Sequence, residues 1–286
     1  MEYSGWNVIE NQFDPAELHH KETLFSLGNG YLGTRGSFEE SYPGATAATF
    51  IHGVYDDVPV MHTELVNCPD WLPLAIWVGD DRFCLSEGEI LEYKRCLDLR
   101  WGTMRRDVLW RSPSGHTIKF HFERMISMAD EHVMVLHCQI TPVDFTGAIA
   151  VAASINANVE NHSVNHWEWL NQGFNDKHVW LHQRCCHSQI ELGMAFALTC
   201  SDQKAQLQFV NTPNSPTIKT SFTAQPGRTV TLEKIVSVFT SRDVSQPAQA
   251  SQERLINLPN VELFSLLNLT SIAEIILTIV NRFNIY

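Results

Sequence analysis

The stretch HTIKFHFERMIS, residues 116–127, decides the fold class. Its apolar side chains Ile118, Phe120 and Phe122 alternate with polar ones. A period of two is typical of a β-strand with one buried face. The turn sequence Ser112-Pro-Ser-Gly115 precedes this stretch, and we expect it to join two neighbouring antiparallel strands.

Similar strand-like segments follow one another between Trp71 and Phe239, separated by turns and without a helical pattern between them. Such a series predicts an antiparallel sandwich or barrel. The number of strands favours a large two-sheet sandwich over a small immunoglobulin-like one. The other strands are expected at residues 75–78, 80–85, 89–97, 102–111, 132–141, 147–158, 178–184, 189–199, 204–210, 216–223 and 229–239.

The composition changes after this series. Residues 241–252 (SRDVSQPAQASQ) have the composition of a linker, and Leu263–Val280 is rich in Leu and Ile with helix-like spacing. A membrane span needs about 20 mostly apolar residues, and Asn268 and Glu274 interrupt this one. We therefore expect a β domain at residues 1–243, followed at 244–286 by a linker and a helical tail that packs on the sheet or on a partner.

Residues 21–40, KETLFSLGNGYLGTRGSFEE, form a second distinctive stretch, here called the glycine loop. Glycine is used where the backbone needs a positive φ or a close approach. The loop is expected to be tightly turned and to present Asn29, Tyr31 and Arg35. Its spacing Gly-x-Gly-x-x-Gly matches a dinucleotide fingerprint, but neither a buried strand before it nor a long helix after it is indicated. A turn packed against the sheet without a ligand is the simpler interpretation.

Charge and cysteine content narrow the class of protein. The formal net charge of -12, without clustered Lys and Arg, argues against a nucleic-acid partner. The seven cysteines are scattered, and the first residues lack the basic and apolar regions of a signal peptide. These features favour a cytoplasmic protein with free thiols.

Candidates for metal binding and acid–base chemistry are numerous but weakly specified. His178 and His182 have the spacing that binds zinc on a helix, yet their segment is predicted to be a strand, so no metal site is expected. Most carboxylates are exposed or brace loops. The acid–base candidates are Glu22, Glu39, Glu40, Asp56, Asp57, Glu64 and Asp70.

The segment His166-Trp-Glu-Trp169 has the composition of a loop. A sugar ring can stack on an exposed indole, although most tryptophans are core or interface residues. Trp167 and Trp169 are therefore candidates for sugar stacking.

Several separate motifs, in order along the chain, resemble the N-terminal domain of glycoside hydrolase family 65. This family contains disaccharide phosphorylases acting on maltose, trehalose, kojibiose or nigerose, and related hydrolases. The resemblance covers roughly residues 5–245. The motifs are ENQFDPAELHHKETLFSLGNGYLGTRGSFEE (10–40), FIHGVYDD (50–57), ELVNCPDWLPLAIWVGDDRF (64–83), RCLDLRWGTMRRDVLWRSPSGHTIKFHFERMISMADEH (95–132), INANVENHS (155–163) and LEKIVSVFTSRD (232–243).

The resemblance implies a β super-sandwich similar to the galactose-mutarotase-like fold. In the family this domain precedes an (α/α)6 barrel, which carries the general-acid Glu and the phosphate or water site. It implies an α-linked glucose disaccharide as substrate, inorganic phosphate as co-substrate, no other cofactor, and a homodimer. No residue of this chain matches the catalytic-acid motif, so a truncated or split gene product, noncatalytic alone, is expected.

By the same resemblance, six residues are expected at the face that docks the barrel or at the active-site rim: Asn29, Tyr31, Arg35, Asp56, Asp70 and Trp71. Such a docking face is expected to be apolar. Two other functions stay open. One is a stand-alone carbohydrate-binding module that uses Trp167 or Trp169. The other is a sugar epimerase, which would need a His and a Glu side by side, a pair that the sequence does not locate.

Overall fold

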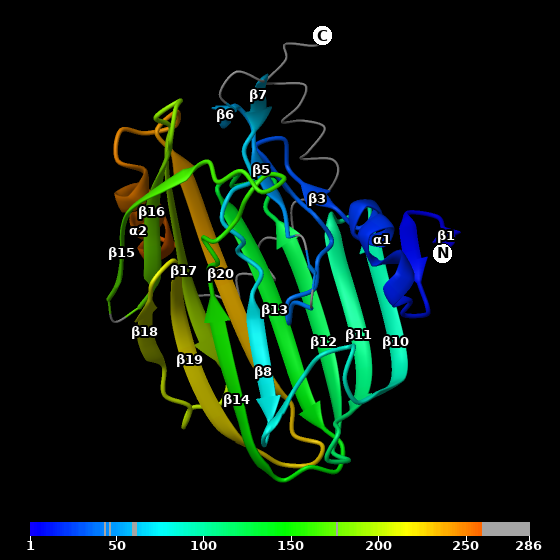
Figure 1. The fold of residues 1–286 in the computed structure, drawn as a ribbon. Helices are drawn as coiled ribbons and strands as arrows, with labels where there is room; N and C mark the ends of the chain where they lie inside the picture. The colour runs from blue at the N-terminus through cyan, green and yellow to red at the C-terminus, as the bar shows by residue number, and fades with distance from the viewer. Residues whose placement is uncertain (43, 46, 59–61, 176, 259–286) are drawn as a thin grey trace.

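A computed structural model describes residues 1–258 apart from 43, 46, 59–61 and 176. Most of the helical tail expected after residue 243, including Leu263–Val280, lies outside the described residues. Two antiparallel sheets face each other in the described part of the chain (Figure 1). The larger has ten strands, in the order β1 (Glu2–Ser4), β2 (Asn7–Glu10), β10 (Glu89–Asp98), β11 (Thr103–Arg111), β12 (Thr117–Ile126), β13 (Val133–Pro142), β20 (Val230–Thr240), β17 (Glu191–Cys200), β16 (Val179–Cys185) and β15 (Trp167–Phe174).

The smaller sheet has five strands and covers only part of the larger one (Figure 1). Its order is β18 (Gln208–Thr212), β19 (Ser215–Ala224), β14 (Gly147–Ser154), β8 (Leu74–Val78) and β9 (Asp81–Arg82). Two small sheets lie at one end: β3 (Leu27–Gly28), β4 (Leu32–Thr34) and β5 (Thr49–Ile51), and the pair β6 (Tyr55–Val58) and β7 (His62–Leu65). The helical elements are η1 (Pro15–Glu17), α1 (Leu18–Leu24) and α2 (Pro247–Ile256).

The predicted large antiparallel sandwich is confirmed. Strand β12 pairs with β11 across the turn at 112–115, and Ile118, Phe120 and Phe122 are all buried. The inner faces of both sheets contribute to one continuous apolar core. The neighbouring strands expected at 75–78 and 80–85 correspond to β8 and β9, which pair as a hairpin.

The N-terminal residues form an edge hairpin, β1–β2. Two segments differ from their predicted form. The segment 166–169, whose composition suggests a loop, instead leads into the edge strand β15, which pairs with β16. The linker at 241–252 contains the start of helix α2, which packs on β17, β20 and β16. Gly193 allows this contact, since a Cβ there would lie 2.2 Å from the backbone nitrogen of Ala248.

A row of three arginines crosses the inner face of the larger sheet where the smaller sheet does not cover it. Arg95, Arg106 and Arg124 lie on the adjacent strands β10, β11 and β12, and all three are fully buried. Cross-strand pairing places Arg95 opposite Arg106. Buried charges of one sign need hydrogen-bonded counter-charges close by. The structure must therefore supply carboxylates at this face.

The glycine loop and the strand before it supply them. Arg95 Nε donates to Glu10 Oε2 at 2.9 Å, and Arg106 Nη1 donates to Glu40 Oε1 at 2.6 Å. Glu39 lies between two arginines, 2.7 Å from Arg106 Nη2 and 3.2 Å from Arg124 Nη1. The Glu39 and Glu40 carboxylates thus bridge the loop to the sheet.

Lys234 of β20 connects the two sheets elsewhere in the core. Its buried ammonium donates to the carbonyl oxygens of Trp71 at 2.5 Å, Pro73 at 3.1 Å and Ser154 at 2.7 Å. Burial lowers the pKa of Lys234 to about 7, opposed by the nearby charge of Asp70. Trp71 and Pro73 precede β8, and Ser154 ends β14, so one side chain holds the ends of two strands of the smaller sheet.

The arginine row predicts a contrast between two adjacent residues of β11. Arg106→Met would leave the buried carboxylates of Glu39 and Glu40 without the positive charge that Arg106 supplies to both. We therefore expect the free energy of unfolding in urea to fall by about 3–5 kcal/mol. Arg105→Met is the matched control, because Arg105 lies on the outward face of β11 with 44% of its side chain exposed. Its partner Glu123 is largely buried, so the control has a cost of its own, but that cost should be clearly smaller than the cost of Arg106→Met. Equal losses in the two variants would contradict this account of the glycine loop.

Candidate functional site

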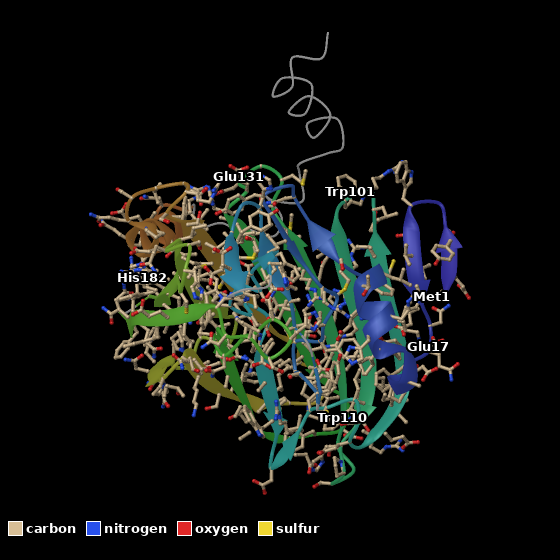
Figure 2. All side chains as sticks on the ribbon, turned by 45° about the horizontal axis from the view of Figure 1, so that its top comes forward. Met1, Glu17, Trp101, Trp110, Glu131 and His182 are labelled. Atoms are coloured by element: carbon tan, nitrogen blue, oxygen red, sulfur yellow. The ribbon has the colours of Figure 1, made fainter. Side chains whose placement is uncertain are left out.

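One end of the sandwich gathers most of the sequence-predicted site residues. This loop end, at the top of Figure 1 and brought forward in Figure 2, contains β3–β7 and the turns that follow β10 and β12. Trp101 and Glu131 mark these two turns, whereas Trp110 lies toward the opposite end (Figure 2). The loop end is therefore assembled from segments that are distant in sequence.

Asn29 fixes the glycine loop to the turn after β12. Its Nδ2 donates to the carbonyl oxygens of Ser127 at 2.7 Å and Glu131 at 3.0 Å. Its Oδ1 accepts from the backbone nitrogens of Tyr31 and Leu32, both at 3.0 Å. The amide is thus engaged on both sides within the domain.

Tyr31 connects the glycine loop to the end of β20. Its hydroxyl donates to Asp243 Oδ2 at 2.5 Å, and the same oxygen accepts from the backbone and hydroxyl of Thr240. The Tyr31 ring packs edge-on against His132, which in turn stacks on Phe239. Burial, and then the bond to Asp243, raise the pKa of the Tyr31 phenol well above its ordinary value. It is therefore a neutral donor at physiological pH.

Arg35 is directed back into its own loop. Its Nη2 donates to the carbonyl oxygen of His19 at 2.8 Å and lies 3.4 Å from Glu22 Oε2. The Glu22 carboxylate also accepts a short hydrogen bond from the Tyr42 hydroxyl. In this arrangement Arg35 stabilises the fold of residues 19–42, and its side chain is only partly exposed.

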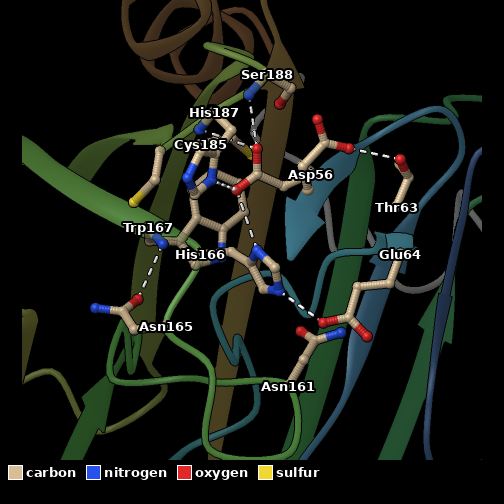
Figure 3. A network of polar contacts seen from close by, with 12 residues as sticks. Asp56, Thr63, Glu64, Asn161, Asn165, His166, Trp167, Cys185, His187 and Ser188 are labelled. Carbon is tan, nitrogen blue, oxygen red and sulfur yellow. Dashed lines mark hydrogen bonds and ion pairs between the residues drawn. The ribbon is translucent and has the colours of Figure 1, made fainter. Parts of the chain in front are cut away.

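A group of titratable side chains surrounds His166 (Figure 3). His166 Nδ1 lies 3.0 Å from Asp56 Oδ2, and its Nε2 lies 2.7 Å from Glu64 Oε1. The ring is 1% exposed. Both ring nitrogens face carboxylate oxygens. Asp56 and Glu64 stand on the paired strands β6 and β7, so His166 clamps this hairpin from outside it.

Asp56 is also the anchor of the turn between β16 and β17. Its Oδ1 accepts from the backbone nitrogens of His187 at 3.0 Å and Ser188 at 2.6 Å. Burial raises the pKa of Asp56, but the bonds from Ser188, His166 and His187 together outweigh it and hold the pKa below its ordinary value. The bond from His166 likewise lowers the pKa of Glu64. Asp56 therefore joins three separate segments through its ionised form.

This geometry limits the chemistry that the group can perform. The His–Glu pair that an epimerase would need does exist here, as His166 and Glu64. However, both ring nitrogens are bonded to carboxylates and the ring is buried, so His166 offers no nitrogen to a substrate. The exposed members are His187 and His62, at the outer edge of the group. Its bonds hold the β6–β7 hairpin, the start of β15 and the turn between β16 and β17 together. Asp56, Glu64 and His166 are therefore called the brace of the loop end.

Asp70 and Trp71 lie beneath this surface. Asp70 pairs through its backbone with Asn156, and its Oδ1 accepts from the backbone nitrogen of Leu72 at 3.0 Å. Trp71 is fully buried. Their side chains belong to the interior where β8 begins.

Trp167 and Trp169 differ in exposure although both belong to β15. Trp167 is 5% exposed, and its indole nitrogen donates to the carbonyl oxygen of Asn67 at 2.7 Å. Trp169 is 49% exposed. Of the two, Trp169 has the indole that a ligand in solvent can reach.

The described residues lack two further features, a metal-binding cluster and a membrane-spanning helix. No group of three or more His, Cys, Asp or Glu side chains is arranged there to hold a metal ion. No helix within the same residues has the length and apolarity to cross a membrane.

Sequence reasoning named Asp56 and Glu64 as carboxylates but missed their partner and the turn that they hold. His166 is 110 residues from Asp56, and His187 and Ser188 are still further away. Nothing in a single sequence connects positions that far apart. The local signal in the sequence was that Asp56 and Asp57 come shortly before Glu64, with apolar residues between them. This spacing is compatible with a hairpin that brings the carboxylates opposite each other.

The brace predicts a pH-dependent stability difference between two neighbouring aspartates. Asp56→Asn should lower the free energy of unfolding at pH 7 by about 1.5–3 kcal/mol, the range for a hydrogen bond to a charged group. The folded-state pKa of Asp56 is below its unfolded value of about 3.9. Its contribution is therefore complete above that value and is lost as the pH falls through the folded-state pKa.

Urea unfolding from pH 7 to pH 3 measures this difference. The gap between wild type and Asp56→Asn should narrow below about pH 4. Asp57→Asn is the control, because the exposed Asp57 accepts from Thr63 alone in the described contacts; its cost should stay within about 0.5 kcal/mol. A gap that does not change with pH would argue against an ionised Asp56 as the anchor.

Comparison with known proteins places this fold and loop end in a family. The family model for the N-terminal domain of glycosyl hydrolase family 65 matches residues 8–267. A kojibiose phosphorylase of Halothermothrix orenii is 32% identical over 248 residues, which cover 85% of this chain and 32% of that protein. An alpha,alpha-trehalose phosphorylase of Thermoanaerobacter brockii is 28% identical over 274 residues, covering 85% and 35%.

A solved structure has the same fold. It is described as a putative kojibiose phosphorylase from human microbiome, with a TM-score of 0.81 at 20% identity, over 92% of this chain and 36% of that one. The chain spans about a third of the length of the curated relatives named above. With the family model matching most of its residues, the chain belongs to glycosyl hydrolase family 65, of which it represents the N-terminal domain.

Proposed function

We propose that this chain is the supporting, noncatalytic domain of an inverting α-glucoside phosphorylase or hydrolase. The relatives are named as phosphorylases of kojibiose and of alpha,alpha-trehalose, and each is about three times as long as the part that matches. The substrate of the whole enzyme would be an α-linked glucose disaccharide, with inorganic phosphate as co-substrate in a phosphorylase. The reaction would take place in an (α/α)6 barrel domain. There a general acid protonates the glycosidic oxygen while phosphate or water attacks from the opposite face.

The observation that carries this proposal is the state of the acid–base groups at the loop end. Asp56 and Glu64 are each bonded to His166, and Arg35 is bonded to Glu22. An inverting glycosidase needs two carboxyl groups about 6.5–9.5 Å apart with room for a nucleophile between them. Asp56 and Glu64 instead hold a hairpin and a turn in place. Carboxylates with this structural role are consistent with a supporting domain rather than with a catalytic site.

Exposed apolar side chains at the same end support docking of another domain. Trp6, Leu99 and Trp101 are exposed, and the backbone nitrogen of Leu99 donates to the carbonyl oxygen of Trp6 at 2.8 Å, so these turns are adjacent. Tyr55 on β6 is exposed as well. Adjacent exposed apolar residues mark interaction sites more often than scattered ones do. We propose that this surface faces the barrel.

The proposal includes a cytoplasmic location and a homodimer of the complete enzyme. All seven cysteines are free thiols, which suits a reducing compartment. The homodimer follows from the resemblance to the family.

A turnover assay of the 286-residue chain tests the noncatalytic assignment. The chain is incubated with maltose, trehalose and kojibiose, with and without phosphate, while glucose and glucose 1-phosphate are followed. We expect no product above the level of a sample without protein. Product that requires phosphate would show an active site within this chain and would refute the proposal.

A chimaera tests the docking surface. This chain would replace the corresponding domain of the Halothermothrix orenii kojibiose phosphorylase, and phosphorolysis of kojibiose would be measured after heating. Leu99→Ser should lower the stability of the docked domains by about 1.5–3 kcal/mol, the value of burying one leucine. Val143→Ser, an exposed apolar residue in the turn after β13, is the control and should have no effect. Identical inactivation of the two variants would remove the loop end as the docking face.

A further inference from the structure

A hollow of about 340 Å³ lies at the side of the sandwich where the edge strand β15 meets the smaller sheet. Its lining comes from the loop before β15, from β15 and β16, and from Asn214 in the turn between β18 and β19. This volume is near the lower limit for small-molecule sites in proteins. The hollow has no part in the brace around His166.

Trp169 and Gln183 form the centre of this hollow. They are direct cross-strand partners in the β15–β16 ladder, so their side chains stand next to each other on one face of the sheet. Trp167, two residues earlier on β15, points to the same side. Its bond to Asn67 holds the indole as a fixed wall, while Trp169 leaves about half of its surface to solvent.

Two glutamines on this face show a contrast. Gln172 is fully engaged: its Nε2 donates to Asn211 Oδ1 at 2.5 Å and to the carbonyl oxygen of Thr212 at 2.7 Å, and its Oε1 accepts from the backbone nitrogen of Asn214 at 2.9 Å. Gln183 is 3% exposed, and its Oε1 has no hydrogen-bond partner among the described residues. Other buried side-chain atoms also lack a partner, but among the described residues that line the hollow Gln183 alone has such an atom. A buried acceptor without a partner at a hollow points to a group that the described chain does not supply.

The chemistry of the lining indicates a neutral, hydroxyl-rich ligand. Amide side chains come from Asn158, Asn165 and Asn214, and a single carboxylate comes from Glu160. The described residues that line the hollow include no Lys or Arg, which are the usual partners of a phosphate group. An exposed indole beside amide groups offers one flat apolar surface and several hydrogen bonds. A pyranose ring has this combination, with C–H groups on its faces and hydroxyl groups around its edge.

We propose that this hollow is a saccharide-binding site of the domain itself, with Trp169 as the stacking surface and Gln183 Oε1 as the acceptor of a sugar hydroxyl. The ligand is an uncharged pyranose sugar rather than a sugar phosphate. The bulge between Trp169 and Asn171 keeps Trp169 and Gln172 on the same side, so that Gln172 fastens the β18–β19 turn beside the ligand. This site goes beyond the supporting role proposed above and does not depend on it.

Calorimetric titration of the 286-residue chain with maltose tests the site, with glucose 1-phosphate as the charged comparison. We expect saturable binding of maltose to one site and weaker binding of glucose 1-phosphate. Trp169→Ala should weaken maltose binding about tenfold or more, because the stacking surface is removed. Tyr3→Ala is the control and should leave maltose binding unchanged, since Tyr3 is an exposed aromatic side chain on β1 that lines neither the hollow nor the proposed docking surface.

Gln183→Leu provides a second test of the same site, with a thermal melt to show that the variant is folded. It should weaken maltose binding while glucose 1-phosphate binding stays weak. Absence of saturable maltose binding, or binding that Trp169→Ala leaves unchanged, would overturn the site. Tighter binding of glucose 1-phosphate than of maltose would overturn its neutral ligand class. Product formation in the turnover assay would refute the noncatalytic role but would leave the result of this titration standing.

Discussion

The constraint on which this structure depends is the burial of three guanidinium groups on one face of a sheet. Arg95, Arg106 and Arg124 occupy inward positions of adjacent strands. A second sheet of aliphatic side chains could not cover them, because buried charges without partners are far more costly than the gain from the added apolar contact. The smaller sheet covers the aliphatic part of the larger one, and the glycine loop with Glu39 and Glu40 covers the charged part.

Aromatic rings complete the cover of these charges. The Phe25 ring centroid lies 4.0 Å from the Arg95 guanidinium carbon, and Phe38 lies 4.4 Å from that of Arg106. The backbone must approach closely for these rings and carboxylates to reach the sheet. At Gly36 a Cβ would come within 2.6 Å of Phe25 Cβ, and the Gly36 carbonyl accepts from Arg95 at 3.0 Å. The glycines that resemble a nucleotide fingerprint lie in a loop whose role is this close packing.

The sequence allowed much of the fold to be predicted, and some of the unexpected features had a local signal. The alternation of Ile118, Phe120 and Phe122 located the inner face of β12, and the same period of two continues to Arg124. Arg106 likewise falls between Met104 and Val108 on β11. An arginine at an inward position of a regular strand predicts a buried counter-charge, although it does not say which carboxylate supplies it.

The helix and the brace were beyond such reasoning for different reasons. Residues 247–256 are polar and contain a proline, so their composition suggests a linker. The contacts that make the helix part of the domain come from distant segments, at Gly193, His178 and Asp130. The pairing of His166 with Asp56 and Glu64 depends on the relative placement of the β6–β7 hairpin and the start of β15. Local patterns describe each segment alone, and placement arises from the packing of the whole sandwich.

The use of polar groups separates the structural from the ligand-binding parts of this domain. Asn29, Asp56 and Lys234 each bond several backbone groups, and each joins segments that are distant in sequence. Such residues are costly to replace and bind nothing further, because their bonding capacity is used within the fold. Gln183 has the opposite character, since its buried oxygen lies beside an exposed indole without a described partner. A buried acceptor that belongs to the lining of a hollow, beside an exposed indole, has the binding capacity of a ligand site at that position.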